Sequence, residues 1–124
     1  LLLHDVPCGG NFVHWETISR VWGALDASNV STGQFVGYWM PGAQVTGDDP
    51  RVRVSYYAWP GERRLLVVLG NMTAEPASVR LSFGNLIPPG AAPAAPNAET
   101  GEPVALAEPV SLADRDFRLL RVTW

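Results

Sequence analysis

The stretch RVRVSYYAWPGERRLLVVLGN, residues 51–71, decides the fold of this chain. Apolar and polar residues alternate in its first half, which is the period-two pattern of a half-buried strand. Pro60 and Gly61 then supply a turn, because proline fixes φ and glycine tolerates a positive φ. Residues 65–69 are apolar throughout and predict a central strand that is covered on both faces. The two halves together predict a hairpin at the core of a β-sheet domain.

Composition narrows the classes of partner. The chain has 124 residues and a net charge of −3, with no run of like charge. A basic footprint for nucleic acid or for an anionic membrane surface is therefore not expected. No apolar stretch reaches the roughly 20 residues that a membrane-spanning helix needs. We expect neither nucleic acid nor a membrane as a partner.

One helix is predicted over residues 15–27, ahead of the β-rich part. Large apolar residues recur there at the spacing of one helical face. A helix this short is marginal alone, so its apolar face must dock on this domain or on a neighbouring one. An extended aromatic segment, FVGYWM, follows at residues 35–40. The predicted interface residues are Trp15, Ile18, Trp22, Leu25, Tyr38 and Trp39.

The remaining patterns predict a mainly β fold, an antiparallel β-sandwich with one N-terminal helix. A Pro/Ala stretch at residues 85–97 reads as an extended crossover along the surface, because proline cannot donate to a ladder. We expect two parts: a strand-loop-helix segment at 1–40 and a β-sandwich domain at 41–124. Strands are predicted at residues 51–59, 64–71, 77–83, 103–106, 110–112 and 116–122.

His4 and Asp5 are weak catalytic candidates. They follow a short apolar run and precede a glycine-containing loop, and catalytic residues of a (β/α) barrel gather at such strand ends. A capped strand end explains them as well, and we favour it. His4, Cys8 and His14 match no zinc spacing and lack a fourth ligand. The sequence therefore predicts no metal site, no cofactor and no catalytic set within this chain.

The paired acids and the sequons have ordinary explanations. Asp48 and Asp49 stand beside glycine and proline, and Asp114 and Asp116 precede a strand, so turn geometry accounts for them. Glycosidase carboxylates must flank a sugar at about 5–9.5 Å, which residues on one turn do not arrange. The glycosylation sequons that begin at Asn29 and at Asn71 are short motifs that often occur by chance.

Two rings of the hairpin are the candidate ligand-binding residues. Tyr57 and Trp59 share the face of the first strand that is predicted to point outward. Exposed rings there would stack on a sugar or cover a protein partner. We favour a domain interface, because Trp and Tyr are enriched at protein interfaces.

A family resemblance extends this interpretation. The runs at residues 54–84, 97–106 and 110–122 resemble the C-terminal β-sandwich that follows the catalytic (β/α)8 barrel in many bacterial glycoside hydrolases. Residues 1–40 are similar to the last strand and helix of such a barrel with the link that follows it, and the whole is similar to family 123-like proteins. The chain is thus expected to begin inside a longer polypeptide.

The resemblance implies a non-catalytic accessory domain of a carbohydrate-active enzyme, which packs against and stabilises the catalytic barrel of the same polypeptide. The parent would be a bacterial glycoside hydrolase, and the resemblance leaves open whether it is secreted or periplasmic. The alternative is a carbohydrate-binding module that grips a glycan through Tyr57 and Trp59. Self-association of the chain through its apolar helix face is a further expectation.

Overall fold

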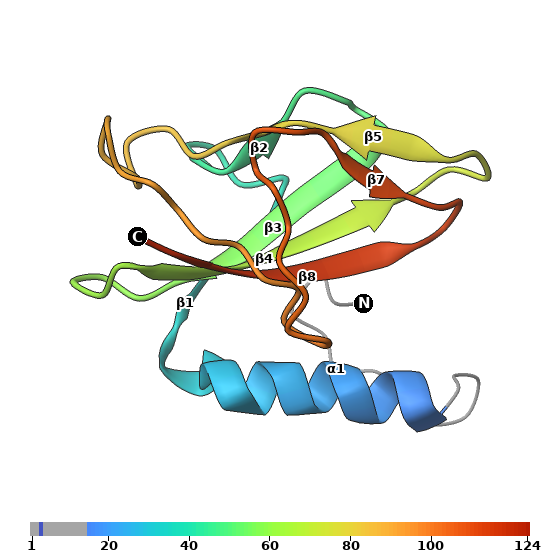
Figure 1. Cartoon of the computed structure of the whole chain (residues 1–124), viewed down its shortest axis with the longest axis horizontal. Helices are drawn as coiled ribbons and strands as arrows, with labels where there is room; N and C mark the ends of the chain where they lie inside the picture. The colour runs from blue at the N-terminus through green and yellow to red at the C-terminus, as the bar shows by residue number, and fades with distance from the viewer. Residues whose placement is uncertain (1–2, 4–14) are drawn as a thin grey trace.

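A computed structural model describes Leu3 and residues 15–124 of the chain. The expectations for His4, Asp5, Cys8 and His14 lie outside the described residues. The described part is mainly β, with antiparallel sheets and one α-helix, which confirms the predicted fold class. Figure 1 shows three layers, with helix α1 below, the main sheet in the middle and short strands above.

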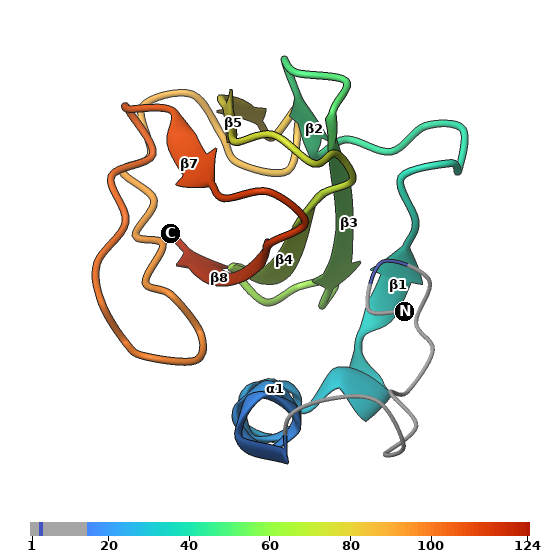
Figure 2. The ribbon, with the colours of Figure 1, turned by 90° about the vertical axis from the view of Figure 1, so that its right-hand side faces the viewer.

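Helix α1 spans Trp15–Ser28 and agrees with the predicted helix within one residue. Its buried face consists of Ile18, Val21, Ala24 and Ser28. A short 3-10 helix, η2 (Val30–Thr32), turns the chain into the sheet. Figure 2 views α1 end on and shows that it lies beneath the sheet.

The central sheet has the order β1-β3-β4-β8, and all its pairs are antiparallel. Its strands are β1 (Gln34–Val36), β3 (Val52–Ala58), β4 (Arg64–Asn71) and β8 (Phe117–Thr123). The predicted hairpin is the pair β3–β4, in which Val54 faces Leu69 and Tyr57 faces Leu66. Every residue of β4 after Arg64 is buried, as the continuously apolar run predicts.

Two short ladders cover the upper face of this sheet. They pair β2 (Thr46–Gly47) with β6 (Leu81–Ser82), and β5 (Ala77–Val79) with β7 (Val110–Leu112). The single strand predicted at 77–83 is therefore wrong, because its two halves pair with different partners and the ladder breaks at Arg80. No strand forms at 103–106. Pro103 has no N–H to give to a ladder, and Val104 and Leu106 only pack their side chains on the core.

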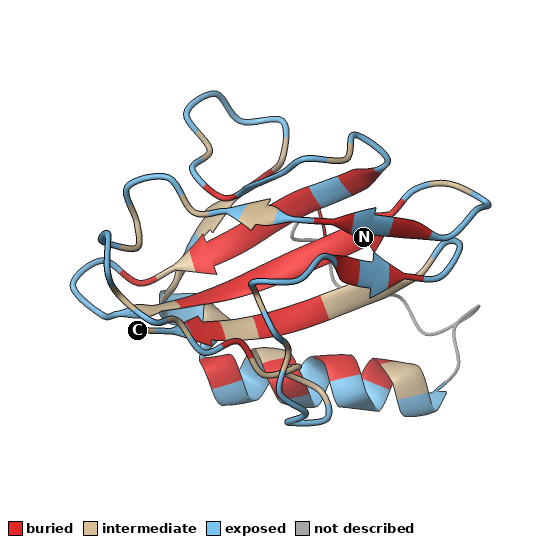
Figure 3. Ribbon diagram, turned by 45° about the horizontal axis from the view of Figure 1, so that its top comes forward, coloured by how far each residue is buried: buried red, intermediate tan, exposed pale blue. Residues whose placement is uncertain are grey.

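The core has two halves, one on each face of β3, β4 and β8. The upper half lies between the sheet and the ladders and includes Val54, Tyr56 and Val67. The lower half lies between the sheet and α1 and includes Val21, Leu66 and Leu119. Buried residues accordingly run along β3 and β4, through part of β8 and along one side of α1 in Figure 3.

The Pro/Ala stretch is an extended crossover, as predicted. Ala94 forms an isolated antiparallel bridge with Thr123, and Asn97 forms one with Leu120. The crossover therefore runs along the outer edge of β8 (Figure 2).

The division expected after residue 40 stays a prediction. In the structure, β1 falls before this boundary and pairs with β3, which falls after it. Among the described residues, no helix has both the length and the apolar character needed to cross a bilayer.

Candidate functional site

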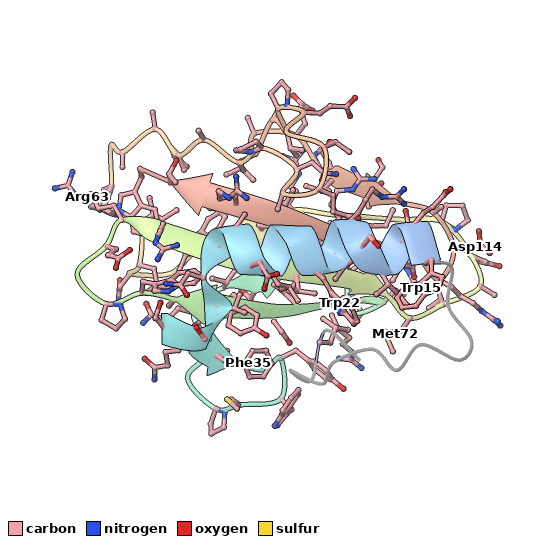
Figure 4. All side chains as sticks on the ribbon, turned by 90° about the horizontal axis from the view of Figure 1, so that it is seen from below. Trp15, Trp22, Phe35, Arg63, Met72 and Asp114 are labelled. Carbon is pink, nitrogen blue, oxygen red and sulfur yellow. The ribbon has the colours of Figure 1, made fainter. Side chains whose placement is uncertain are left out.

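The exposed large apolar side chains are the strongest functional feature of the described surface. Within residues 15–124 they are Trp15 (66% exposed), Trp22 (42%), Trp39 (49%), Met40 (37%) and Met72 (59%). We call Trp15, Trp22 and Met72 the helix-end patch, and Trp39 and Met40 the β1 patch. Figure 4 shows the three residues of the helix-end patch near one another, between the N-terminal end of α1 and its middle.

The helix-end patch owes its exposure to how α1 docks. Small residues on α1, among them Ala24 and Ser28, face the sheet and let the helix approach closely. Trp15 and Trp22 are seven residues apart on the flank of this face. Their ring centroids lie 6.4 Å apart at 77°, the favourable edge-to-face arrangement. The two rings form one pair that is open to solvent.

A groove of about 300 Å³ lies beside Trp22, between α1 and the ends of β4 and β8. Leu3, Ile18, Val68 and Phe117 contribute apolar lining. Met72, Arg115 and Asp116 also line the groove, as do Trp22, Val21, Thr17, Leu69, Gly70 and Asn71. The groove is therefore a largely apolar concavity next to the exposed tryptophan pair.

The predicted interface residues separate into distinct positions. Ile18 is only 2% exposed and Leu25 packs partly buried on the lower core, so both serve this domain's own packing. Trp15 and Trp22 face solvent in the helix-end patch. The two large tryptophans dominate the apolar pattern of the helix sequence. The predicted apolar face of α1 is therefore centred on them, whereas the observed buried face lies further round the helix.

Tyr38 and Trp39 lie in the turn after β1, in a different segment from the two tryptophans of α1. Their rings meet edge-to-face, with centroids 5.1 Å apart, and Trp39 also lies 6.1 Å from Phe35. The Arg53 guanidinium carbon sits 5.2 Å from the centre of the Tyr38 ring, within cation–π range. The turn after β1 is thus held by aromatic contacts.

Ser55 is a functional support that the sequence pattern did not reveal. It is fully buried, and its hydroxyl donates to the Leu3 carbonyl at 2.8 Å. The same oxygen accepts a hydrogen bond from the Tyr38 N–H at 3.0 Å. This one side chain ties both Leu3 and the turn after β1 to the central sheet, and a serine in an alternating strand gives no signal of such a role.

The expected outward position of Tyr57 and Trp59 is wrong. Both are 5% exposed and belong to the lower core, between the sheet and α1. The Trp59 indole N–H donates to the Thr32 hydroxyl at 3.0 Å, and the Arg64 guanidinium stacks 3.9 Å from its ring centre. The predicted half-buried strand is covered on both faces because α1 folds back on the sheet. These two rings offer no open platform for a sugar.

Of the paired acids, Asp49 and Asp116 bind groups close by in the chain, as expected of turn residues, whereas Asp48 binds the backbone of a distant strand segment. Asp48 accepts a hydrogen bond from the Arg80 N–H at 2.8 Å, and Asp116 accepts one from the Phe117 N–H at 2.8 Å. Asp49 forms a 2.7 Å ion pair with Arg51, and this side-chain hydrogen bonding lowers the pKa of Asp49. A carboxylate with a lowered pKa is a poor general acid at neutral pH. Within the described residues, no three His, Cys, Asp or Glu side chains cluster as metal ligands.

Comparison with known families gives one match. Residues 17–88, more than half of the chain, match the family described as glycoside hydrolase 123, C-terminal domain. The match begins within α1 and crosses the boundary that was expected after residue 40. No curated protein matches the chain.

Proposed function

Because the chain belongs to the glycoside hydrolase 123 C-terminal domain family, we propose that it is a non-catalytic accessory domain that packs against and stabilises the catalytic domain of the same polypeptide. The observation that carries this proposal is the exposed aromatic surface. Trp15 and Trp22 stand in solvent although α1 already docks through other residues. Contiguous exposed apolar surface on a small domain typically marks an interface.

A non-catalytic role agrees with the placement of the acids. Glycosidases use two carboxyl groups that flank the scissile bond, one of them with a raised pKa. Asp48, Asp49 and Asp116 instead bind backbone N–H groups or arginine of this domain. The hydrolytic chemistry then belongs to the catalytic domain, which a C-terminal domain of this family implies in the same polypeptide.

A carbohydrate-binding role through Tyr57 and Trp59 loses its support, because both rings are buried against this domain's own helix. The pair that remains exposed on α1 meets edge-to-face at 77°. A sugar platform of two rings needs faces that are nearly coplanar, and this pair does not offer them.

The test compares the full-length glycoside hydrolase with a version that lacks this domain. We expect the catalytic domain to lose at least about 1–2 kcal/mol of stability, or several degrees in its melting midpoint, because an apolar interface is removed. Differential scanning calorimetry measures the midpoint. An unchanged midpoint would contradict the proposal. A saturable change of tryptophan fluorescence when the 124-residue chain is titrated with oligosaccharides would then favour a carbohydrate-binding role.

A further inference from the structure

We infer that the helix-end patch and its adjoining groove form the surface that receives the catalytic domain, with an apolar side chain of that domain seated in the groove beside Trp22. The inference rests on the proposed accessory function and assigns it to one surface. It is carried by the exposed rings, the shape and lining of the groove, and the position of Leu3.

The rings of the patch are free to serve a partner. Helix α1 is held to the sheet by Val21 and Ala24, which belong to the lower core. Trp15 and Trp22 add little to this docking, since they are 66% and 42% exposed. Met72 contributes a third exposed apolar side chain from the turn after β4. A hydrophobic helix flank next to a flexible methionine is typical of a surface that another protein covers.

The lining of the groove favours an apolar occupant. Its lining is dominated by apolar groups, among them Leu3, Ile18 and Val68, with Arg115 and Asp116 as charged members. A sugar would leave hydroxyl groups without partners against such a lining, which costs free energy for each group. An aliphatic or aromatic side chain has no hydroxyl group to satisfy there, and its burial removes apolar area from water.

The position of Leu3 favours the catalytic domain over a second copy of this chain. Leu3 is 7% exposed and lines the groove, and Ser55 binds its carbonyl. A catalytic domain joined ahead of Leu3 is thus tethered at this groove. A short tether gives an effective concentration in the millimolar range, far above that of a free second copy.

The opposite side of the molecule lacks these features. The exposed residues of β5 and β7 are Ser78 and Ser111, whose hydroxyls lie 3.3 Å apart. The neighbouring Arg80 is exposed and donates to the Ala107 carbonyl. A polar surface of this kind is stable in water, so the interface is assigned to the α1 side.

The experiment uses the full-length protein with Trp15→Gln and Trp22→Gln combined, and Trp39→Gln as the matched control on the β1 patch. We expect the double variant to lower the melting midpoint of the catalytic domain, or to split one transition into two. The control removes a ring that packs on Phe35 and Tyr38 of this domain, so it should leave the transition of the catalytic domain unchanged. The same double substitution in the 124-residue chain should leave its midpoint nearly unchanged, because both side chains are exposed there.

Other outcomes would overturn the inference. If domain removal destabilises the catalytic domain but the double variant does not, the accessory function stands and this surface is wrong. If removal itself has no effect, the accessory function fails too. Loss of a dimer in sedimentation of the full-length double variant would assign the patch to a second copy. If the double variant unfolds the 124-residue chain, Met72→Gln replaces it as the test variant. If Met72→Gln then leaves the melting midpoint of the catalytic domain unchanged in the full-length protein, the inference is overturned.

Discussion

At the scale of single residues, Asn71 joins two loops through one buried amide. Its Nδ2 donates to the carbonyls of Glu75 and Ala113, at 2.7 and 2.9 Å. Its Oδ1 accepts hydrogen bonds from the N–H and the hydroxyl of Thr73. Asn71→Asp would replace the donor with a carboxylate that faces two carbonyl oxygens. We expect a loss of about 2–4 kcal/mol at pH 7, measured by urea unfolding of the 124-residue chain.

The loss should depend on pH. Repulsion from the carbonyls would raise the pKa of the introduced carboxyl group in the folded variant above its unfolded value of about 3.9. An acid with a raised folded pKa destabilises the fold above that pKa, and the penalty disappears below the unfolded pKa. The difference in the free energy of unfolding between Asn71→Asp and the wild type should therefore narrow as the pH falls from 7 to about 4. Asn85→Asp, at an exposed position, is the control, and a difference that stays constant with pH would refute the argument.

Residue roles of this kind were the least predictable from sequence. The pattern around Asn71 reads as a glycosylation sequon, yet its amide is buried and engaged. Tyr57 and Trp59 occupy the positions that the alternation along the strand predicts to point outward. They are buried only because α1 packs back on this face of the sheet. Both roles depend on segments distant in the chain, about which local periodicity carries no information.

At the scale of elements, helix α1 is stabilised by a narrow contact with the sheet. Val21 is 3% exposed and packs in the lower core with Leu66, Val68 and Leu119. Val21→Ala should cost about 1–3 kcal/mol, because it removes two methyl groups and leaves a cavity. Urea unfolding of the 124-residue chain measures the loss, and amide exchange in α1 should accelerate with it. Ser19→Ala, on the exposed side, is the control and should be close to neutral.

Long periodic elements were predictable, whereas short ones were predictable only in part, since the strand predicted at 110–112 is β7. The predicted strands at 51–59, 64–71 and 116–122 are β3, β4 and β8 within one residue at each end. Their continuous or alternating apolar runs leave no competing arrangement. The segment 77–83 alternates equally well, but its division between two ladders depends on where β2 and β7 lie. The helix was found, but of the residues on its buried face only Ile18 was predicted, and Val21, Ala24 and Ser28 were not.

At the scale of the whole molecule, the fold protects one edge of its main sheet with a loop. β8 is an edge strand, and an unpaired edge is a template for aggregation. The crossover covers it: Ala94 and Thr123 exchange two hydrogen bonds of 2.9 Å, and the Arg121 N–H donates to the Pro96 carbonyl at 3.0 Å. Prolines fit here because the residues between them supply the N–H groups.

Ala94→Pro tests this edge cover. The substitution removes the N–H that donates to the Thr123 carbonyl and leaves the side-chain surface almost unchanged, since Ala94 is exposed. We expect a loss of about 1–3 kcal/mol in urea unfolding, from one lost bond and local displacement of the crossover. We also expect faster concentration-dependent association in light scattering, because the end of β8 becomes available for pairing. Ala94→Ser keeps the N–H and should behave like wild type. If Ala94→Pro lowers stability without raising association, the crossover stabilises the sheet but does not guard its edge.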